Sequence, residues 1–239
     1  MRPTLRHTAA VGILALVTVL GGCSDAAAPE DGASTGPTEQ TQEPAPTAEP
    51  TTEAPVGTTL PPEVMLTGAD FGMDREDAVV TEPIGTWALP DACTGGVPST
   101  AAASRGVAYG NGELESTVGT HQVAVFADVA EATAEAQRLG DVMTACAAAP
   151  AQDGGALFVE DVPVGAQGKG LAVDYYGTSA GTDGQESLGY FVAITRRGNA
   201  VTLSGHLGGE SSVGESRTNA LSTSQAAWEL LCIYDSAGC

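Results

Sequence analysis

The hydrophobic pattern divides the chain into an apolar N-terminal run, an unpatterned polar tract and a patterned domain. Residues 9–20 are predominantly apolar and follow a short basic head. Residues 24–59 show neither helical nor strand periodicity, and regular patterning begins after Leu60. The remaining residues, 60–239, suit one domain and are few for two. We therefore predict a single globular domain over 60–239.

Helical periodicity is clearest in the stretch ADVAEATAEAQRLGDVMTACAAA (127–149). Asp128 and Glu131 have the spacing of a capping box at a helix start. Apolar side chains then recur every three or four residues, which places one apolar stripe on the helix. The pattern predicts a helix of about 20 residues whose buried face carries Ala132, Ala136, Leu139, Met143 and Cys146.

Alternating positions predict strands before and after this helix. Arg197-Gly198-Asn199 suits a tight hairpin between the last two strands. A short helix with proline in its first turn is expected at 60–66, and an amphipathic helix led by Leu221, Trp228 and Leu231 closes the domain at 218–234. Helices that accompany a meander of strands predict an α+β fold, an antiparallel sheet with helices packed on it. The expected strands are 114–128, 169–178, 186–198 and 199–207.

The apolar N-terminal run is too short for a membrane span. As a helix, residues 9–22 rise about 21 Å, against a hydrocarbon core of about 30 Å. A basic head followed by a short apolar region indicates a secretory signal peptide at 1–22. Its end, Leu20-Gly21-Gly22-Cys23, resembles the bacterial lipobox. We predict that Cys23 is lipidated and begins the mature chain, which acyl chains then hold at a membrane's outer face. The alternative is an ordinary signal peptide in which this cysteine falls by chance.

The polar tract after Cys23 lacks the side chains that build a core. Residues 24–59 contain six prolines, eight threonines, seven acidic residues and no basic or aromatic residue. Such a segment buries too little apolar surface to offset its conformational entropy. We therefore predict that 23–59 is a lipidated cysteine followed by a disordered tether that holds the domain away from the lipid.

The domain is strongly acidic, since residues 60–239 carry seven Lys or Arg against twenty-three Asp or Glu. A surface of this charge repels polyanions, so we expect no nucleic-acid partner. We expect a monomer.

Four cysteines belong to the domain, and an even number in an exported protein favours disulfides. No pair has the CxxC spacing of a zinc or redox motif. We predict the pairs Cys93–Cys146 and Cys232–Cys239, because Cys146 ends the buried helix face near the Trp87–Cys93 loop and the C-terminus turns back within seven residues. The rival pairing joins Cys93 to Cys232 and Cys146 to Cys239.

Candidate chemistry in the domain is sparse. His121 and His206 lack metal-site spacing, and we expect surface or half-buried structural roles for both. The segment GAQGKG (165–170) departs from the P-loop pattern, so we interpret it as a flexible start to the next strand. The acidic segment 74–79 lacks the order of a calcium loop and suggests a solvated turn. We therefore expect no catalytic residue, no metal and no cofactor.

Two tyrosines stand in the strand pattern at DYYGT (174–178). Tyr175 and Tyr176 would point to opposite faces of a strand, one into the core and one outward, where a cleft is an alternative to plain solvent.

Residues 60–239 resemble a family, the exported sensor-type domain of PknH-like kinases and related lipoproteins. The resemblance rests on a strand ending VAVFAD, a long Ala-rich helix ending in a cysteine, PVGAQGKGLAV and AITRRGNAVTL. Departures include Met143, where the family often has tryptophan, and Leu188-Gly189-Tyr190, where it often has a cysteine. The resemblance implies a domain with a central cleft that binds a ligand of the envelope, and no catalytic set.

These patterns predict a membrane-anchored extracytoplasmic lipoprotein with a non-enzymatic domain that binds or senses an unknown ligand. The alternative is a lipid or glycolipid carrier, which needs a large apolar cavity. A cell-wall hydrolase or a transporter's solute-binding protein has less support, since the first lacks a catalytic set and the second needs two lobes.

Overall fold

A computed structural model describes residues 57–73, 77–112, 116–149, 154–178 and 185–234. The predicted signal peptide, Cys23, almost all of the tether and Cys239 lie outside the described residues. Of the tether, only Gly57–Thr59 is described, and these three residues are exposed and have no regular structure.

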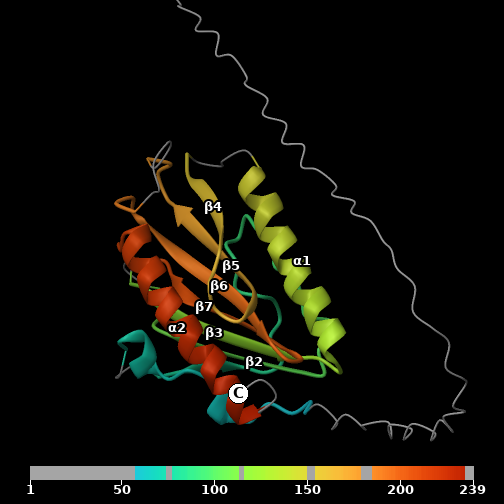
Figure 1. Cartoon of the computed structure of the whole chain (residues 1–239). Coiled ribbons are helices and arrows are strands. Elements are labelled where there is room, and N and C mark those ends of the chain that lie inside the picture. The colour runs from blue at the N-terminus through green and yellow to red at the C-terminus, as the bar shows by residue number, and fades with distance from the viewer. Residues whose placement is uncertain (1–56, 74–76, 113–115, 150–153, 179–184, 235–239) are drawn as a thin grey trace, which may run out of the picture. The chain divides into compact units, whose positions relative to one another are not determined.

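The described residues form a seven-stranded antiparallel sheet in the order β1-β2-β3-β7-β6-β5-β4 (Figure 1). Two meanders meet where β3 pairs with β7, so strands far apart in sequence occupy the middle of the sheet. The predicted α+β architecture is confirmed. The strands are β1 (Val79–Thr81), β2 (Ala103–Tyr109), β3 (Val118–Val125), β4 (Ala156–Asp161), β5 (Ala166–Asp174), β6 (Gly189–Arg197) and β7 (Ala200–Leu207).

Two helices cover opposite faces of this sheet. Alternation along β6 shows the division: Val192 and Ile194 belong to the core beneath α1 (Val129–Ala148), whereas Phe191 and Ala193 belong to the core beneath α2 (Val213–Tyr234). Figure 1 shows the sheet between α1 and α2. The domain therefore has three layers, with buried apolar clusters on both faces of the sheet.

Helix α1 begins as predicted. The Asp128 side chain accepts a 2.8 Å hydrogen bond from the Glu131 amide, which satisfies one of the free N–H groups of the first turn. Four of the five predicted stripe residues are buried, and Cys146 is half-buried at the last turn. The predicted strands on β3, β5, β6 and β7 are confirmed as well, and the hairpin turns at Gly198, whose φ of 51° suits glycine.

Helix α2 differs from the prediction in its start and in its buried face. It begins at Val213, five residues before the expected start, and Leu221 and Trp228 are only half-buried. The buried stripe consists mostly of small residues: Val213, Ser216, Ala220, Thr223, Ser224, Ala227 and Leu231. Short side chains bring the helix backbone close to the sheet, where hydroxyls form hydrogen bonds, for example between the Oγ atoms of Ser204 and Ser224 at 2.9 Å.

The N-terminal segment packs on the α2 face through η1 (Pro62–Val64) and η2 (Gly68–Phe71). This confirms the short proline-led helix. The expectation of a surface or half-buried position for His121 and His206 is wrong, because both are buried. Their burial follows from the segment that covers them, whose Leu66 amide donates to Nδ1 of His121 at 3.0 Å and whose Phe71 ring contacts His206.

The start of the described chain is fixed at one end of the sheet. Asn199, in the β6–β7 turn, donates from Nδ2 to the Gly57 carbonyl at 3.0 Å, and the Tyr234 hydroxyl also donates to that carbonyl. The same Tyr234 hydroxyl lies 2.6 Å from Oδ1 of Asn199. These contacts hold Gly57, which lies in the predicted tether, against the last turn of α2.

Candidate functional site

The least open of three hollows in the described domain is a half-open pocket of about 340 Å³ at the C-terminal end of α1. The loop at 90–92 forms one wall, and the adjoining ends of β4 and β5 form another. Its volume lies at the low end of the range of small-molecule sites, about 300 to 1,000 Å³. The lining residues are Pro90, Ala92, Cys146, Ala147, Ala149, Gly155, Ala156, Leu157, Val173, Asp174 and Tyr175.

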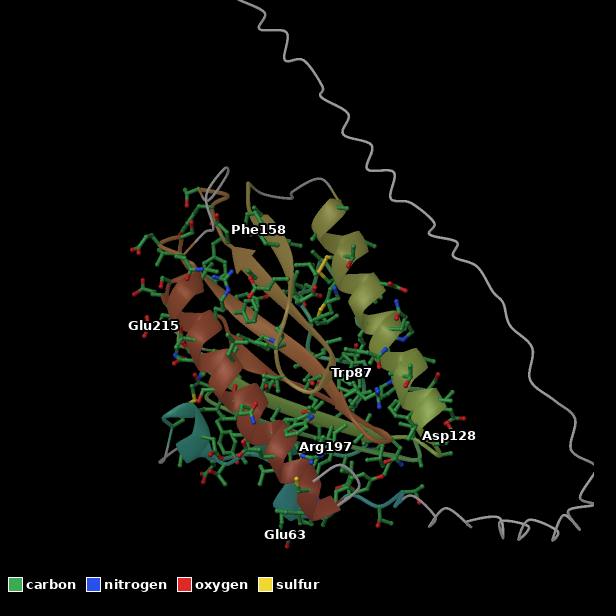
Figure 2. All side chains as sticks on the ribbon, viewed as in Figure 1. Glu63, Trp87, Asp128, Phe158, Arg197 and Glu215 are labelled. Atoms are coloured by element: carbon green, nitrogen blue, oxygen red, sulfur yellow. A yellow bond between two sulfur atoms is a disulfide. The ribbon has the colours of Figure 1, made fainter. Side chains whose placement is uncertain are left out.

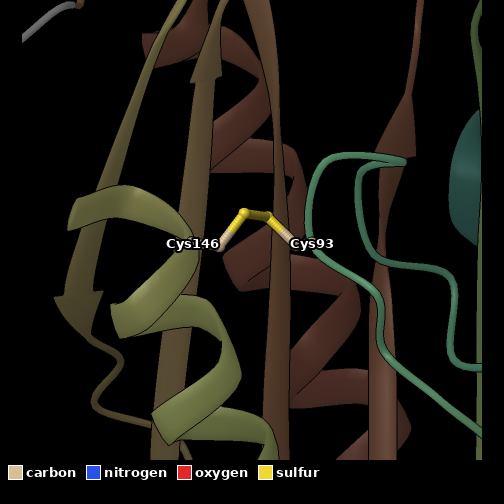
Figure 3. Close-up of a disulfide and its surroundings, with 2 residues drawn as sticks. All are labelled: Cys93 and Cys146. Atoms are coloured by element: carbon tan, nitrogen blue, oxygen red, sulfur yellow. A yellow bond between two sulfur atoms is a disulfide. The ribbon is translucent and has the colours of Figure 1, made fainter. Parts of the chain in front are cut away.

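A disulfide holds the loop of this pocket against α1. Cys93 and Cys146 are bonded, with their Cα atoms 5.3 Å apart, and Figure 3 shows the bond between the loop and the last turns of the helix. This pair is the predicted one, and the rival pairing of Cys93 with Cys232 is excluded. Cys232 lies on α2, and its predicted partner Cys239 is outside the described residues, so the second pairing stays a prediction.

Polar contacts attach the same loop to α1 further along the helix. Trp87 is 1% exposed and donates from Nε1 to Oε1 of Glu135 at 2.7 Å. The same carboxylate accepts two 2.7 Å bonds from Arg138, which also donates to the Gly95 carbonyl. Figure 2 shows Trp87 between α1 and the sheet. This pairing raises the pKa of Arg138, chiefly through its hydrogen bond to Glu135. The pocket therefore has a loop wall fixed at two places.

The outer wall of the pocket is the edge strand β4, which α2 holds from the opposite face. Arg217 on α2 donates from Nε to Oε1 of Glu160 at 2.9 Å, and its Nη2 lies 2.9 Å from Oε2. Such a two-point pair fixes the geometry of both side chains. The guanidinium of Arg217 also lies 5.5 Å from the ring centre of Phe191. The wall is thus supported although β4 has a neighbour strand on one side only.

The polar end of the pocket is formed where β5 ends. Asp174 is fully buried, and its Oδ1 accepts 3.0 Å bonds from the amides of Tyr176 and Gly177. This carboxylate therefore shapes the turn that follows the strand. Asp174 shares a face of β5 with Ala172, which belongs to the core beneath α2, so its carboxylate points away from the pocket.

Three tyrosine rings stand beside this end. The rings of Tyr175 and Tyr176 meet edge to face at 6.5 Å, and Tyr190 lies 5.8 Å from Tyr175. Burial raises the pKa of Tyr175 and of Tyr190, and nearby Asp91 adds to the effect on Tyr190. Both phenols are therefore neutral at physiological pH. Because β5 ends at Asp174, both tyrosines of the DYYGT segment follow the strand instead of lying in it. Tyr175 is half-buried and lines the pocket, whereas Tyr176 is 66% exposed.

Two further hollows are slightly larger and more open to solvent. One of about 360 Å³ lies between η1, η2 and the end of α2, and Glu63, Asp70 and Glu229 surround its apolar floor. The other, of about 420 Å³, lies over the Glu135–Arg138 pair. Neither is lined by a cysteine, a histidine or an aromatic ring.

The remaining candidate motifs have structural positions. Residues 166–170 of this segment form the first part of β5, whose pairing with β6 is irregular between Ala166 and Lys169. Lys169 forms an ion pair with Asp161 at 2.5 Å. This confirms its interpretation as the start of a strand. The acidic segment 74–79 lies partly outside the described residues. Within the described ranges, no group of three histidine, cysteine, aspartate or glutamate side chains is arranged to hold a metal.

Few features of the sequence predict the pocket itself. Its walls are mostly alanine, glycine and proline, residue types that carry no chemical signature, and β4 was not predicted. The available signals were Cys146 at the end of the helix and the paired tyrosines.

Among the helices that the structure describes, none has the length and apolar character needed to cross a bilayer.

Comparisons with known proteins relate the chain to a solved extracellular domain by fold. No family model matches the chain, and no curated protein matches it. The structure of the extracellular domain of PknH from Mycobacterium tuberculosis is similar, with a TM-score of 0.50 and 14% sequence identity. The match covers 73% of this chain and 98% of that one. The two domains therefore share a fold over nearly the whole of the PknH domain.

Proposed function

We propose that the chain is a membrane-anchored extracytoplasmic lipoprotein whose domain binds a ligand and does not transform it. The observation that carries this proposal is the pocket of about 340 Å³ between the disulfide-bonded loop, the end of α1 and the β4–β5 edge. A preformed, mostly apolar hollow with a few polar groups is the usual form of a small-molecule site.

Three independent features support a location outside the cytoplasm. The chain begins with a short apolar run that ends in a lipobox-like Leu20-Gly21-Gly22-Cys23. A disulfide holds the pocket loop, and disulfides persist in oxidising compartments. The fold is similar to that of a domain described as extracellular. The first feature also supports the lipid anchor, with residues 24–59 as its tether.

The chemistry of the pocket supports binding over catalysis. Asp174 is the one acidic residue among those that line the pocket, and its Oδ1 is engaged by two backbone amides. His121 and His206 belong to the opposite face, in the layer beneath η1, η2 and α2. A nucleophile paired with a base, the minimum for covalent catalysis, is missing from the pocket's described lining.

The size of the pocket favours a compact ligand over the cargo of a lipid or glycolipid carrier. Its volume is near the lower limit for drug-sized molecules, whereas acyl chains need a longer apolar channel.

The position of the pocket along β6 also supports a site that faces away from the membrane. Val173 and Asp174 pair with the start of β6, and Asn199, which holds Gly57, follows the end of β6. The length of this strand separates pocket and tether by about 26 Å, so the pocket lies away from the anchored end of the domain.

The test is native mass spectrometry of the full chain, purified from its own envelope in a mild detergent. We expect a single compact adduct on the wild-type protein. Ala147→Trp, which fills the pocket from α1, should remove it, and Ala148→Trp, at the exposed neighbouring position, should not. Retention of a series of lipids would favour the carrier instead. Equal adducts on both variants would place the ligand elsewhere.

A further inference from the structure

The pocket described above combines three properties that together select a class of ligand: an apolar interior, negative charge and aromatic rings at one end. This inference rests on the proposed binding function and concerns what is bound. Among the residues that line the pocket, none is basic. Anions such as fatty acids or phosphates would therefore enter without a counter-charge, inside a protein of net charge −21.

An exposed carboxylate stands in the loop wall of the pocket. Asp91 lies between two lining residues, Pro90 and Ala92. Burial raises the pKa of Tyr190, and the charges of Tyr175 and Asp91 add to this shift. The Tyr190 ring lies 5.8 Å from that of Tyr175, which lines the pocket. A cation at the mouth of the pocket gains from the Asp91 charge.

The rings add a preference that carboxylates alone do not provide. Tyr176 is largely exposed and meets Tyr175 edge to face, while Tyr175 forms part of the pocket lining. Tyrosine faces attract ammonium groups, and weakly hydrated organic ammonium ions are the cations that aromatic groups bind in proteins. Small metal ions would instead need a cluster of oxygen ligands. An exposed ring next to an apolar hollow thus fits a cation that is itself partly apolar.

We infer that the pocket takes an organic cation with a compact apolar body, the body lying among the alanine walls and the cationic head lying against Tyr176 and Asp91. The apolar part of such a ligand loses its water in the pocket, and its charge stays at the mouth, where desolvation is small. Affinity for the head then depends on salt, whereas affinity for the body does not.

The experiment compares three probes that share one apolar body and differ in the head group. They are 4-phenylbutyltrimethylammonium, 4-phenyl-1-butanol and 4-phenylbutyrate. Binding to the full chain carrying Cys23→Ala is measured by calorimetry at low and high salt. We expect the ammonium probe to bind at least about fivefold more tightly than the alcohol and the carboxylate to bind most weakly. High salt should narrow these differences.

Two variants test the named side chains. Tyr176→Leu keeps apolar area and removes the ring, and Asp91→Asn removes the charge, so each should lower ammonium affinity severalfold and leave the alcohol unchanged. Asp141→Asn removes one exposed charge from α1 outside the pocket and should have no effect. Equal binding of all three probes, or unchanged ammonium affinity in both variants, would overturn the inference and leave the binding function standing. If no probe binds, the inference is overturned, and the proposed function then depends on the mass spectrometry alone.

Discussion

The indole Nε1 of Trp87 donates a 2.7 Å hydrogen bond to Oε1 of Glu135, and this contact joins the loop before β2 to the middle of α1. Glu135 is 9% exposed and also receives the two bonds from Arg138. The loop that these contacts fix continues to Pro90 and Cys93, in the wall of the pocket. The relationship therefore connects the core of the α1 layer to the proposed binding site.

Removal of this carboxylate should destabilise the domain. Glu135→Ala leaves the Trp87 indole and the Arg138 guanidinium without their acceptor, and we expect a loss of about 2 kcal/mol in the free energy of unfolding. Trp87→Phe keeps most of the ring and should cost about 1 kcal/mol through the lost hydrogen bond. Urea unfolding of each variant measures its loss in the free energy of unfolding. Glu210→Ala, at an exposed position, is the control, and a loss for Glu135→Ala no larger than its loss would contradict the structural role.

The Cys93–Cys146 bond should contribute more than any single hydrogen bond. It closes a loop across 53 positions of sequence separation, for which chain entropy gives about 4 kcal/mol. We expect the double variant Cys93→Ser and Cys146→Ser to lose about this amount in urea unfolding under non-reducing conditions. An unchanged unfolding midpoint would show that the loop is held by Trp87 and Arg138 alone.

The second predicted bridge, Cys232–Cys239, is decided by peptide mapping without reduction. We expect a peptide in which Cys232 and Cys239 are bonded to each other, which is lighter than its reduced form by the two thiol hydrogens. Asp235, Ser236 and Gly238 offer the turn between the two cysteines. Its short loop gives only about 2.5 kcal/mol, so its removal should mainly loosen the C-terminus. A Cys232 peptide joined to a second domain chain would instead indicate an intermolecular bridge.

Helix α1 was predictable because cap, periodicity and burial all agree along its sequence. Asp128 caps it, and Leu139 and Met143 follow at helical spacing into a core wide enough for large side chains. The hydrophobic pattern predicts the start and the buried face of α2 wrongly, because the buried side chains of this helix are mostly polar or small. Ser216 and Ser224 are buried by close packing on the sheet, which hydrophobic periodicity does not reveal.

Strands β1, β2 and β4 were missed for physical reasons of a similar kind. Strand β2 includes Arg105 and Gly106 and reads as a loop, yet pairing with β3 on one side fixes it as a strand. Strand β4 is six residues long and ends in two acids, one of which pairs with Arg217 on α2. Such partners are set by the tertiary structure, so local sequence carries little trace of them.

The lipid anchor is tested by one substitution. If Cys23 carries the acyl chains, Cys23→Ala should move the protein from the membrane fraction to the soluble fraction, because no other anchor is predicted. Ser24→Ala, one residue later, is the matched control and should stay with the membrane. Membrane association of Cys23→Ala equal to that of the wild type would show that the lipobox interpretation is wrong.

Burial of His121 should make the stability of the domain depend on pH. Its Nδ1 accepts the Leu66 amide proton, and its Nε2 lies 2.8 Å from the Thr202 hydroxyl, so the folded protein holds a neutral ring. Burial lowers the pKa of His121 to about 3, although Asp70 opposes the shift. The unfolded chain has the ordinary value of about 6.5 and therefore takes up a proton first. The stabilising effect is complete above pH 6.5 and is lost as pH falls toward 3, by up to about 1.4 kcal/mol per pH unit.

Urea unfolding between pH 5.0 and 6.5 isolates this effect, because most carboxylates titrate below that interval. His206, whose pKa burial also lowers, contributes a slope of the same sign. His121→Gln removes one of the two contributions, and we expect the slope of unfolding free energy against pH to fall clearly below that of the wild type, whatever the variant's overall stability. His206→Gln should reduce the slope as well and serves as the comparison. A slope in His121→Gln as steep as that of the wild type would mean that the folded protein already protonates His121 in this range, and that the Leu66 amide has another acceptor.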